Sequence, residues 1–361
     1  MADTEQTRLI RDSAAAFVRR SDGLKIARDS RCRDGLTPLH SVMAESGWLG
    51  MLVPEDDGGY GGRFSDMAAL CEELAKGLAE MPVLRTGVFG CRSLVHAPPS
   101  ATRTRLLERL VAGELHLGVA WHGGELQMTD DAGSITSGRL EHVPCDSAVD
   151  GVVALAVSQG NHALVLLPFE GAKLTVEREW LVDGTPAVSL TVPGSGIDAV
   201  EVLATGEAAR NAFQTARLEA TVMASAALLG VMSASFELTR SYLCTRVQFG
   251  KPIGSFQALA HRSVDQYVQQ QLARDVLAQA IEALDAQSGL RSPAVVHRAK
   301  ARCSDAAMKI TRESIQMHGA IGFTDEYDAG LFLKRAIVLN AWLGNSAYHR
   351  RCYNNLDKET A

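Results

Sequence analysis

The chain has 361 residues and a formal net charge of −6, and 46% of its residues are hydrophobic and 22% charged. This is an ordinary globular composition, which excludes a disordered or fibrous chain, and the length suffices for two or three domains. Lysine and arginine are scattered and the calculated pI is about 5.9, so no basic stripe is available to neutralise a phosphate backbone. We therefore expect no nucleic-acid partner.

The cysteine content and the lengths of the apolar runs indicate the cellular location of the protein. The seven cysteines are an odd number, without a CxxC pair or a Cys/His pair at zinc-ligand spacing, which favours a reducing compartment and predicts no metal site. The first 17 residues lack a basic region followed by an apolar one. The longest apolar runs, such as 152–157 and 222–232, are shorter than the roughly 20 residues of a membrane span. We expect a cytoplasmic protein without a membrane span.

Residues 1–114 are predicted to form a helical domain. Apolar residues recur three and four positions apart, as at Leu70, Leu74 and Leu78. The stretch 53–62 contains four glycines and one proline, which cannot continue a helix. A structural glycine-rich loop is expected there, between two helices.

Residues 115–205 are predicted to form a β-domain. Short segments rich in β-branched residues follow one another, bounded by glycine, aspartate, asparagine or proline. The predicted strands are 115–121, 135–143, 152–157, 163–167, 174–177, 188–192 and 200–203. Because strands follow one another directly, a β-sandwich or barrel is favoured over a doubly wound sheet, and no GxGxxG or GxxxxGK[ST] motif is present.

Residues 206–361 are predicted to form a helix bundle, which gives an α+β protein in the order helical, β, helical. A helix of about 25 residues is expected to place six apolar residues on one stripe, which neighbouring helices would bury. These residues are Val264, Val268, Leu272, Val276, Ala280 and Leu284.

Three segments share motifs with a known family. They are Pro54–Gly61 followed by Glu72–Leu74, then Arg246–Gln257 (RVQFGKPIGSFQ), then Gln316–Tyr327 (QMHGAIGFTDEY) followed by Lys334 and Arg335. In this order, around a β-domain, they resemble the acyl-CoA dehydrogenase family of flavoproteins. The resemblance extends over nearly the whole chain and is weakest in residues 115–205.

The resemblance implies an N-terminal helical domain, a middle β-barrel or sandwich and a C-terminal four-helix bundle. It also implies a dimer of dimers that binds FAD in a cleft between domains and at a subunit interface. The expected reaction is α,β-dehydrogenation of an acyl-CoA thioester: a carboxylate removes the α-proton while the β-hydrogen leaves as hydride to the flavin. An electron-transferring flavoprotein is the implied electron acceptor.

The same resemblance implies residues that approach the FAD of the neighbouring subunit. Arg246 and Phe249 match positions that face its pyrophosphate and adenine, and Gln257 continues that segment. A guanidinium suits a pyrophosphate because its fork meets two oxygens at once. Gln316, Gly319 and Ala320 match the segment that approaches the same FAD, where small residues permit close backbone contact.

The flavin cradle of the chain itself departs from the family pattern. The family's middle domain usually has a TEP-AGSD-like loop, and then a GxKxWIT-like strand whose Trp and Thr pack against the isoalloxazine. The corresponding stretches here are 119–124 and 138–144, in which His142 replaces the Trp and Pro144 the Thr. We therefore expect an incomplete flavin site in this chain.

The catalytic base departs from the pattern as well. Most family members have a Glu-Gly pair some eight residues after the Arg of the third segment, and counting from Arg335 gives Leu343 and Gly344. Leucine cannot accept a proton. Some members use a Glu on an earlier helix instead, at a position that matches Ala220 here. Glu219, one residue away and about 100° around the helix, is the alternative candidate base, and a solvated helix carboxylate is the other interpretation of it.

Three hypotheses follow. The first is a catalytically degenerate subunit that completes the FAD site of a homologous, base-bearing partner, similar to bacterial α2β2 acyl-CoA dehydrogenases acting on CoA esters of steroid or bile-acid side chains. The second is an independently active homotetramer with a relocated base. The third is a non-enzymatic assembly subunit that keeps only the fold.

Overall fold

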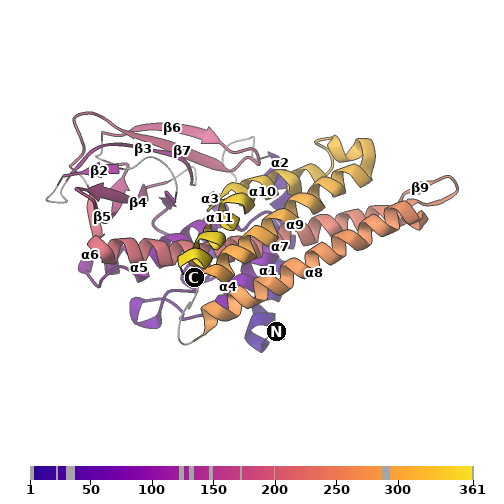
Figure 1. The fold of residues 1–361 in the computed structure, drawn as a ribbon, viewed down its shortest axis with the longest axis horizontal. Helices are drawn as coiled ribbons and strands as arrows, with labels where there is room; N and C mark the ends of the chain where they lie inside the picture. Colours follow the sequence, from indigo (N-terminus) through magenta and orange to yellow (C-terminus); the bar gives the residue numbers. More distant parts are fainter. Residues whose placement is uncertain are drawn as a thin grey trace. The chain divides into compact units, whose positions relative to one another are not determined.

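The computed structural model describes residues 4–21, 23–29, 37–121, 126–129, 134–145, 149–170, 173–198, 200–286 and 293–359. The chain forms two compact units: unit 1 contains residues 1–28, 64–80 and 221–361, and unit 2 contains residues 29–63 and 81–220. Helix α7 (Gly206–Thr245) contributes its first part to unit 2 and its second part to unit 1 (Figure 1). The division at 1–114, 115–205 and 206–361 stays a prediction, because helices of the first segment are shared between the units.

Unit 1 is helical. Its helices besides α7 are α1 (Glu5–Ser21), α2 (Gly23–Asp29), α4 (Phe64–Lys76), α8 (Gln257–Asp285), α9 (Ala294–His318), α10 (Ala329–Ala341) and α11 (Ser346–Glu359). Helix α9 packs against α8, α10 and α11, and α1 packs against α4; Figure 1 shows α8 and α9 side by side. The buried face of α9 includes small residues such as Ala299, Ala306 and Ala307, which let neighbouring helices approach closely.

Helix α7 crosses α4 at a glycine. A Cβ atom on Gly230 would lie 2.1 Å from the carbonyl oxygen of Glu72, so only glycine fits at this crossing. By length and composition α7 could span a membrane, but 83% of its most apolar window is buried inside the chain. This burial is typical of a central helix in a globular fold.

Helix α8 differs from the prediction. Val264, Val268 and Leu272 are exposed, whereas Ala280 and Leu284 are buried. The reason is geometric: each four-residue step advances about 40° beyond a full turn, so a strict four-residue series winds around the helix and its two ends face opposite sides. The face that packs into unit 1 contains two amides as well, Gln266 and Gln270. An apolar stripe of the first three residues therefore faces outward from this chain.

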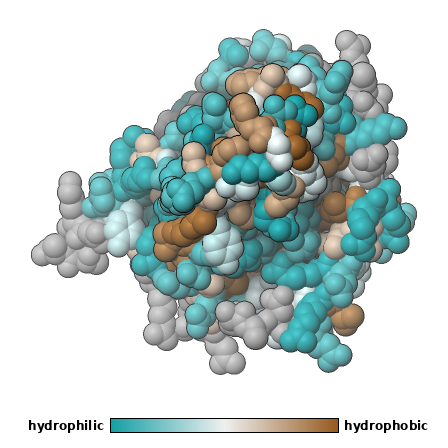
Figure 2. All heavy atoms as spheres, turned by 90° about the vertical axis from the view of Figure 1, so that its right-hand side faces the viewer, coloured by the Kyte–Doolittle hydropathy of each residue, from teal (hydrophilic) through white to brown (hydrophobic). Residues whose placement is uncertain are grey.

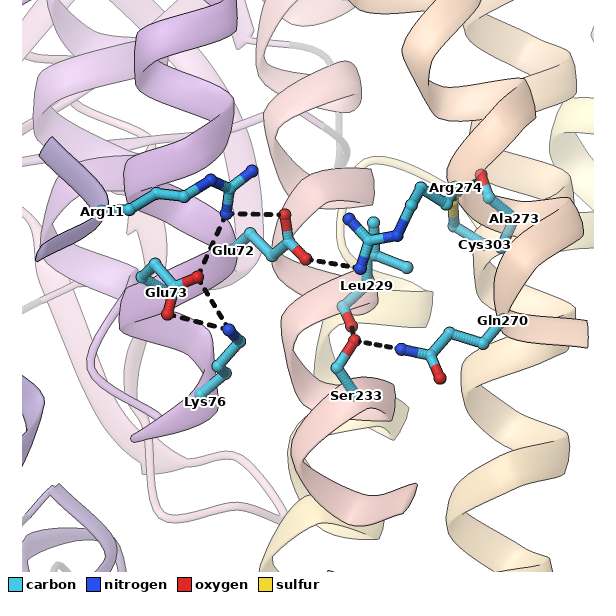
Figure 3. A network of polar contacts seen from close by, with 10 residues as sticks. All are labelled: Arg11, Glu72, Glu73, Lys76, Leu229, Ser233, Gln270, Ala273, Arg274 and Cys303. Carbon is cyan, nitrogen blue, oxygen red and sulfur yellow. Dashed lines mark hydrogen bonds and ion pairs between the residues drawn. The ribbon is translucent and has the colours of Figure 1, made fainter. Parts of the chain in front are cut away.

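A buried ionic network joins α1, α4 and α8 within unit 1. Figure 3 shows Glu72 between two guanidinium groups, with Arg11 Nη1 at 3.0 Å and Arg274 Nη2 at 2.9 Å from its oxygens. Arg11 also contacts Glu73 at 3.1 Å. Burial alone would raise the pKa of Glu72, but the charges of Arg274 and Arg11 outweigh it and hold the pKa below its usual value. The two cations together therefore favour the ionised form of this buried carboxylate.

Unit 2 contains short helices and the sheet. The helices are α3 (Thr37–Glu45), the 3-10 helix η2 (Glu55–Asp57), the π-helix η3 (Val83–Gly90), α5 (Cys91–Val95) and α6 (Ala101–Val111). The glycine-rich stretch 53–62 forms η2 and turns, with Gly58 and Gly61 at positive φ. The loop contacts α6 through Arg103, which donates to the carboxylate of Asp57.

The sheet has eight strands in the order β6-β7-β3-β2-β4-β5-β8, and β1 pairs with β4 in parallel. The strands are β1 (Leu117–Val119), β2 (Leu126–Met128), β3 (Ile135–Pro144), β4 (Gly151–Ser158), β5 (Asn161–Pro168), β6 (Thr175–Trp180), β7 (Pro186–Val192) and β8 (Glu201–Thr205). One apolar core joins the inner faces of β3 and β7 to those of β4 and β5. The seven predicted strands are confirmed with small shifts of their ends, and β2 was not predicted.

Candidate functional site

A hairpin projects from the end of α7. Strands β9 (Val247–Gln248) and β10 (Lys251–Pro252) pair antiparallel. The two turn residues, Phe249 and Gly250, have φ values of 50° and 80°, and positive φ at both central positions is the pattern of a type I′ turn. The turn leaves the Phe249 ring 91% exposed at the tip, where β9 lies at one end of unit 1 (Figure 1).

Arg246 joins α7 to this hairpin. Its backbone N–H donates to the carbonyl of Tyr242 and its carbonyl accepts from the N–H of Ile253, each at 2.8 Å. The side chain is exposed, and within the part of the chain that the structure describes no hydrogen bond or ion pair engages its guanidinium. A fixed backbone with an exposed, uncommitted guanidinium suits bidentate binding of a phosphate.

Aromatic and cationic groups surround the hairpin base. Phe256 lies edge-on to Phe249, with 6.1 Å between ring centroids, and the Lys251 ammonium lies 4.3 Å from the Phe256 centroid. This cation–π contact places a second positive charge near the tip. Gln257 follows as the first residue of α8 and is exposed. The predicted segment is thus one continuous surface of positive charge, aromatic rings and an amide.

The end of α9 forms the second predicted segment. The helix stops at His318 because Gly319 adopts φ 67° and ψ −141°, a conformation that residues with a Cβ rarely adopt. Nothing lies within 4 Å of where a Cβ on Gly319 would be. Gln316, Gly319 and Ala320 are all exposed, and the last two begin the 3-10 helix η5 (Gly319–Phe323). The backbone here is open to close approach by a ligand.

The structure brings the two segments together within unit 1. The ring of Tyr242, one turn before Arg246 on α7, lies 4.5 Å from the ring of His318, the residue before Gly319. We call Arg246, Phe249, Gln257, Gln316, Gly319 and Ala320 the rim. Figure 2 faces the end of unit 1 with the hairpin and shows apolar surface among polar side chains. Exposed apolar residues of the rim segments include Val247, Ile321 and Phe323.

The rim fits one half of an FAD molecule chemically. A free guanidinium and an ammonium can neutralise a pyrophosphate, and an exposed phenyl ring can stack on an adenine. The open glycine backbone leaves space for the ligand. These are properties of the adenosine diphosphate half, and the rim offers no planar cradle for the isoalloxazine.

The residues predicted to stand at the family's flavin-packing positions belong to a polar cluster in unit 2. His142 sits in a bulge of β3 with φ 51°, and its Nδ1 lies 2.8 Å from Glu179 Oε2 on β6. The Ser189 hydroxyl on β7 donates to the same carboxylate and accepts from the His142 N–H at 3.1 Å. Pro144 is buried. An exposed imidazole bound to a carboxylate thus stands where an indole would pack, while residues 122–125 of the other flavin stretch lie outside the described residues.

Electrostatics keep Glu179 charged in this cluster. Partial burial would raise the pKa of its carboxyl, but the hydrogen bonds from Ser189 and His142 hold it below its usual value. At the predicted flavin-packing position, a carboxylate would repel the negative charge that a flavin acquires on reduction. The cluster is therefore a poor substitute for the aromatic packing that the resemblance implies.

The predicted position of the usual catalytic base is an apolar turn. Leu343 follows α10, is 1% exposed and adopts φ 62°, and Gly344 after it has φ 103°. The buried Lys300 ammonium on α9 contacts four carbonyl oxygens of this segment, at 2.9–3.2 Å, from Leu339, Asn340, Trp342 and Gly344. His349 Nε2 lies 3.0 Å from the Leu343 carbonyl oxygen. The turn is held firmly and has no carboxylate at the expected residue.

The interpretation of Glu219 as a solvated carboxylate is wrong. Glu219 is 5% exposed, within unit 2, and both its oxygens accept from Arg92 at 2.8 Å. His96 Nε2 lies 3.0 Å from one of them. Burial would raise the pKa of Glu219, but the hydrogen bonds from Arg92 and His96 outweigh it and hold the pKa below its usual value. A carboxylate stabilised in this way accepts a proton less readily than an ordinary glutamate.

Several residues of these sites had no clear sequence signal. Lys300, Arg92 and His96 contact partners 39 to 127 residues away in the chain, so spacing alone could not reveal them. His318 and Tyr327 lie inside the third motif, which was the available signal. Their packing also involves the ring of Tyr242, which lies outside all three motifs.

Comparison with known proteins gives the family. Residues 4–114 match the model of the acyl-CoA dehydrogenase N-terminal domain, and residues 207–354 match that of the C-terminal domain. The acyl-CoA dehydrogenase IpdE2 of Mycolicibacterium smegmatis is 29% identical, over 92% of this chain and 93% of the relative. The acyl-CoA dehydrogenase FadE34 of Mycobacterium tuberculosis is 31% identical over 87% of this chain, but the match spans only 41% of that relative.

A solved structure agrees with this assignment. A variant of the Tcur3481-Tcur3483 steroid acyl-CoA dehydrogenase superposes with a TM-score of 0.86 at 25% identity, over 99% of this chain and 98% of that chain. The order of helical, β and helical segments predicted from the periodicity is therefore the order of this fold. The chain belongs to the acyl-CoA dehydrogenase family.

Proposed function

We propose that the chain is a subunit of an FAD-dependent acyl-CoA dehydrogenase that has no catalytic base of its own and completes the FAD site of a homologous, base-bearing partner in an α2β2 assembly. One contrast is the main support. Among the described residues, the exposed guanidinium of Arg246 in the rim has no hydrogen-bond or ion-pair partner. Leu343 stands at the predicted base position, and the His142–Glu179 pair stands at a predicted flavin-packing position.

The residues of this chain would act by binding. FAD, when bound, supplies the hydride acceptor for α,β-dehydrogenation. The Arg246 guanidinium would pair with its pyrophosphate in two parallel hydrogen bonds, and the Phe249 ring would lie against its adenine. The opposite side of the FAD would be lined by Gln316, Gly319 and Ala320. The proton of the substrate α-carbon would go to a carboxylate of the partner, because Leu343 cannot take it.

Two further observations support a heteromeric partner. More than half of FadE34 lies outside its match to this chain, which leaves room for a second unit of similar size in one polypeptide. The name of the solved relative, Tcur3481-Tcur3483, joins two different proteins. The outward stripe of Val264, Val268 and Leu272 on α8 offers this chain an apolar surface for such a partner.

The substrate proposal rests on one relative. The Tcur3481-Tcur3483 protein is a steroid acyl-CoA dehydrogenase, so we propose a CoA ester with a steroid or bile-acid side chain for the complex. A site that needs two unlike subunits leaves room for a bulky polycyclic group where a second active site would stand. An electron-transferring flavoprotein as acceptor and a cytoplasmic location complete the proposal.

The test is the FAD content of the complex that co-purifies with the tagged chain, compared with the chain alone. We expect no flavin in the lone chain and one FAD per pair of unlike chains. Arg246→Ala should remove FAD from the complex. Arg240→Ala is the matched control, because Arg240 is an exposed arginine of α7 whose charge is already paired with Glu237 at 2.7 Å. One FAD per lone chain, or full FAD occupancy in Arg246→Ala, would overturn the proposal.

A further inference from the structure

His318 occupies an unusual place at the end of α9. It is 4% exposed, and its Nδ1 lies 2.7 Å from the carbonyl oxygen of Ser314. A carbonyl only accepts, so Nδ1 must bear the hydrogen, and the lone pair of a neutral ring is then on Nε2. Nε2 is buried and has no hydrogen-bond partner within the described part of the chain. Ring packing and the one hydrogen bond to Ser314 therefore hold this buried imidazole in place.

Two tyrosines pack on this imidazole. The ring centroids of Tyr242 and Tyr327 lie 4.5 Å and 4.8 Å from that of His318, and 6.2 Å from each other. Burial lowers the pKa of His318 and outweighs the hydrogen bond to Ser314, which acts in the opposite direction. The three rings form one cluster, which we call the ring cluster.

Each member of the ring cluster belongs to a different segment around the rim. Tyr242 lies on α7, and its carbonyl accepts from the Arg246 N–H at 2.8 Å. His318 directly precedes Gly319. Tyr327 lies in the loop before α10, where Arg28 of α2 donates to the Asp325 carbonyl at 3.1 Å and to the Asp328 carboxylate. The ring cluster therefore connects the hairpin, the glycine turn and an anchored loop.

The ring cluster lies at one end of the packing interface between α7 and α9, which we call the seam. One turn deeper, the hydroxyl groups of Thr239 and Ser314 are 2.7 Å apart and join the same two helices. Beyond His318 the α9 segment leaves helical geometry at Gly319, and beyond Tyr242 α7 gives way to the hairpin. The Tyr242–His318 ring contact lies at this end of the two helices, next to the points where both segments leave helical geometry.

We propose that His318 is a positioning residue for FAD: packed against both Tyr242 and Tyr327, it fixes the spacing between Arg246 and the Gln316–Ala320 segment so that both reach the same pyrophosphate. This inference rests on the proposed function of the rim. Phe249, Gly319 and Ala320 of the rim are exposed and lie outside the α-helices, so without the ring cluster they would have to be ordered by the ligand at a cost in affinity.

The experiment measures the FAD dissociation constant of the co-purified complex, with unfolding midpoints recorded in parallel. His318→Ala removes the ring that packs on the two tyrosines. It should raise the dissociation constant of FAD about tenfold, which corresponds to the cost of ordering one or two side chains on binding. His318→Phe retains a ring packed against the tyrosines and should recover most of the affinity. Thr239→Val breaks the deeper seam contact; it should lower the unfolding midpoint and leave FAD affinity within about twofold.

Three outcomes decide the matter. Weak FAD binding in His318→Ala, with recovery in His318→Phe and none of the loss in Thr239→Val, supports the positioning role. Equal losses in His318→Ala and Thr239→Val, or unchanged affinity in His318→Ala, overturn it while Arg246→Ala still loses FAD. If Arg246→Ala itself keeps FAD, the proposed function of the rim fails instead.

Discussion

The guanidinium of Arg92 binds both carboxylate oxygens of Glu219, with Nε and Nη2 each at 2.8 Å. The same arginine donates through Nη1 to the carbonyl of Leu52 at 3.0 Å. Glu219 therefore serves to neutralise a largely buried cation inside unit 2. A carboxylate with this role has both oxygens committed, which distinguishes it from a general base poised to take a proton from substrate.

Glu219→Gln should destabilise the chain and leave catalysis unchanged. The amide leaves the Arg92 charge without a counter-ion, so we expect a loss of about 2–3 kcal/mol in unfolding free energy. Turnover per folded complex should stay within about twofold. Glu237→Gln is the control, because Glu237 is an exposed carboxylate of the same helix and its surface pair with Arg240 is worth at most about 1 kcal/mol. A folded, FAD-containing Glu219→Gln complex without turnover would instead favour the relocated base.

The same ion pair predicts a pH dependence of stability. The folded-state pKa of Glu219 lies below the usual 4.5, so below pH 4.5 the unfolded chain binds more protons than the folded one. The stabilisation is complete above pH 4.5 and is lost as the pH falls through the folded-state pKa. Urea denaturation should show the wild-type advantage over Glu219→Gln shrinking below pH 4.5. An advantage that is constant down to pH 3 would contradict this account.

Lys300 should be a major contributor to the stability of unit 1. Burial lowers the pKa of Lys300 to about 7. Its amino group contacts the carboxyl end of α10 and the following turn, where four carbonyl oxygens share at most three N–H donors, and Lys300→Met would remove these donors. We expect a loss of about 3 kcal/mol or more in unfolding free energy. Lys309→Met is the matched control on the same helix, since Lys309 is exposed, and should stay within about 0.5 kcal/mol. Equal effects of the two substitutions would argue against the capping role.

The sequence predicted the β-domain better than the environment of the site. Seven strands are predicted because their β-branched runs end at turn residues, whereas β2 (Leu-Gln-Met) contains no β-branched residue. The rim residues were placed by motif resemblance, and the structure brings their two segments together through Tyr242, which no motif includes. Contacts such as Arg92 with Glu219 join residues 127 positions apart and need the fold itself.

The α8 stripe shows a different limit. The four-residue repeat predicts a single apolar helix face, but over the five steps from Val264 to Leu284 the repeat turns through roughly 200°. Its beginning faces outward and its end faces the bundle. The pattern correctly predicted a helix and did not distinguish its buried face from a surface for another subunit.

Gly230 and Gly330 should respond oppositely to alanine. A Cβ on Gly230 would meet the Glu72 carbonyl oxygen at 2.1 Å, so Gly230→Ala must push α4 and α7 apart and should cost about 2 kcal/mol or more. A Cβ on Gly330, in the first turn of α10, meets nothing within 4 Å. Gly330→Ala should therefore stabilise the chain by about 0.5–1 kcal/mol, because alanine loses less conformational freedom on folding. Thermal and urea unfolding of both variants measure these changes, and destabilisation by Gly330→Ala would contradict the argument.

The outward stripe of α8 should be required for assembly. Val268→Glu and Leu272→Glu each place a charge in an apolar surface that a subunit interface would bury, so the co-purified complex should dissociate into smaller species. Light scattering after size-exclusion chromatography measures the mass, and circular dichroism shows whether the helices persist. Glu282→Lys is the control, because it changes the charge at an exposed polar position of the same helix, ten residues beyond the stripe. If Leu272→Glu leaves the mass of the complex unchanged, the partner does not bind through this face. If Glu282→Lys dissociates the complex as well, general charge rather than apolar contact governs assembly.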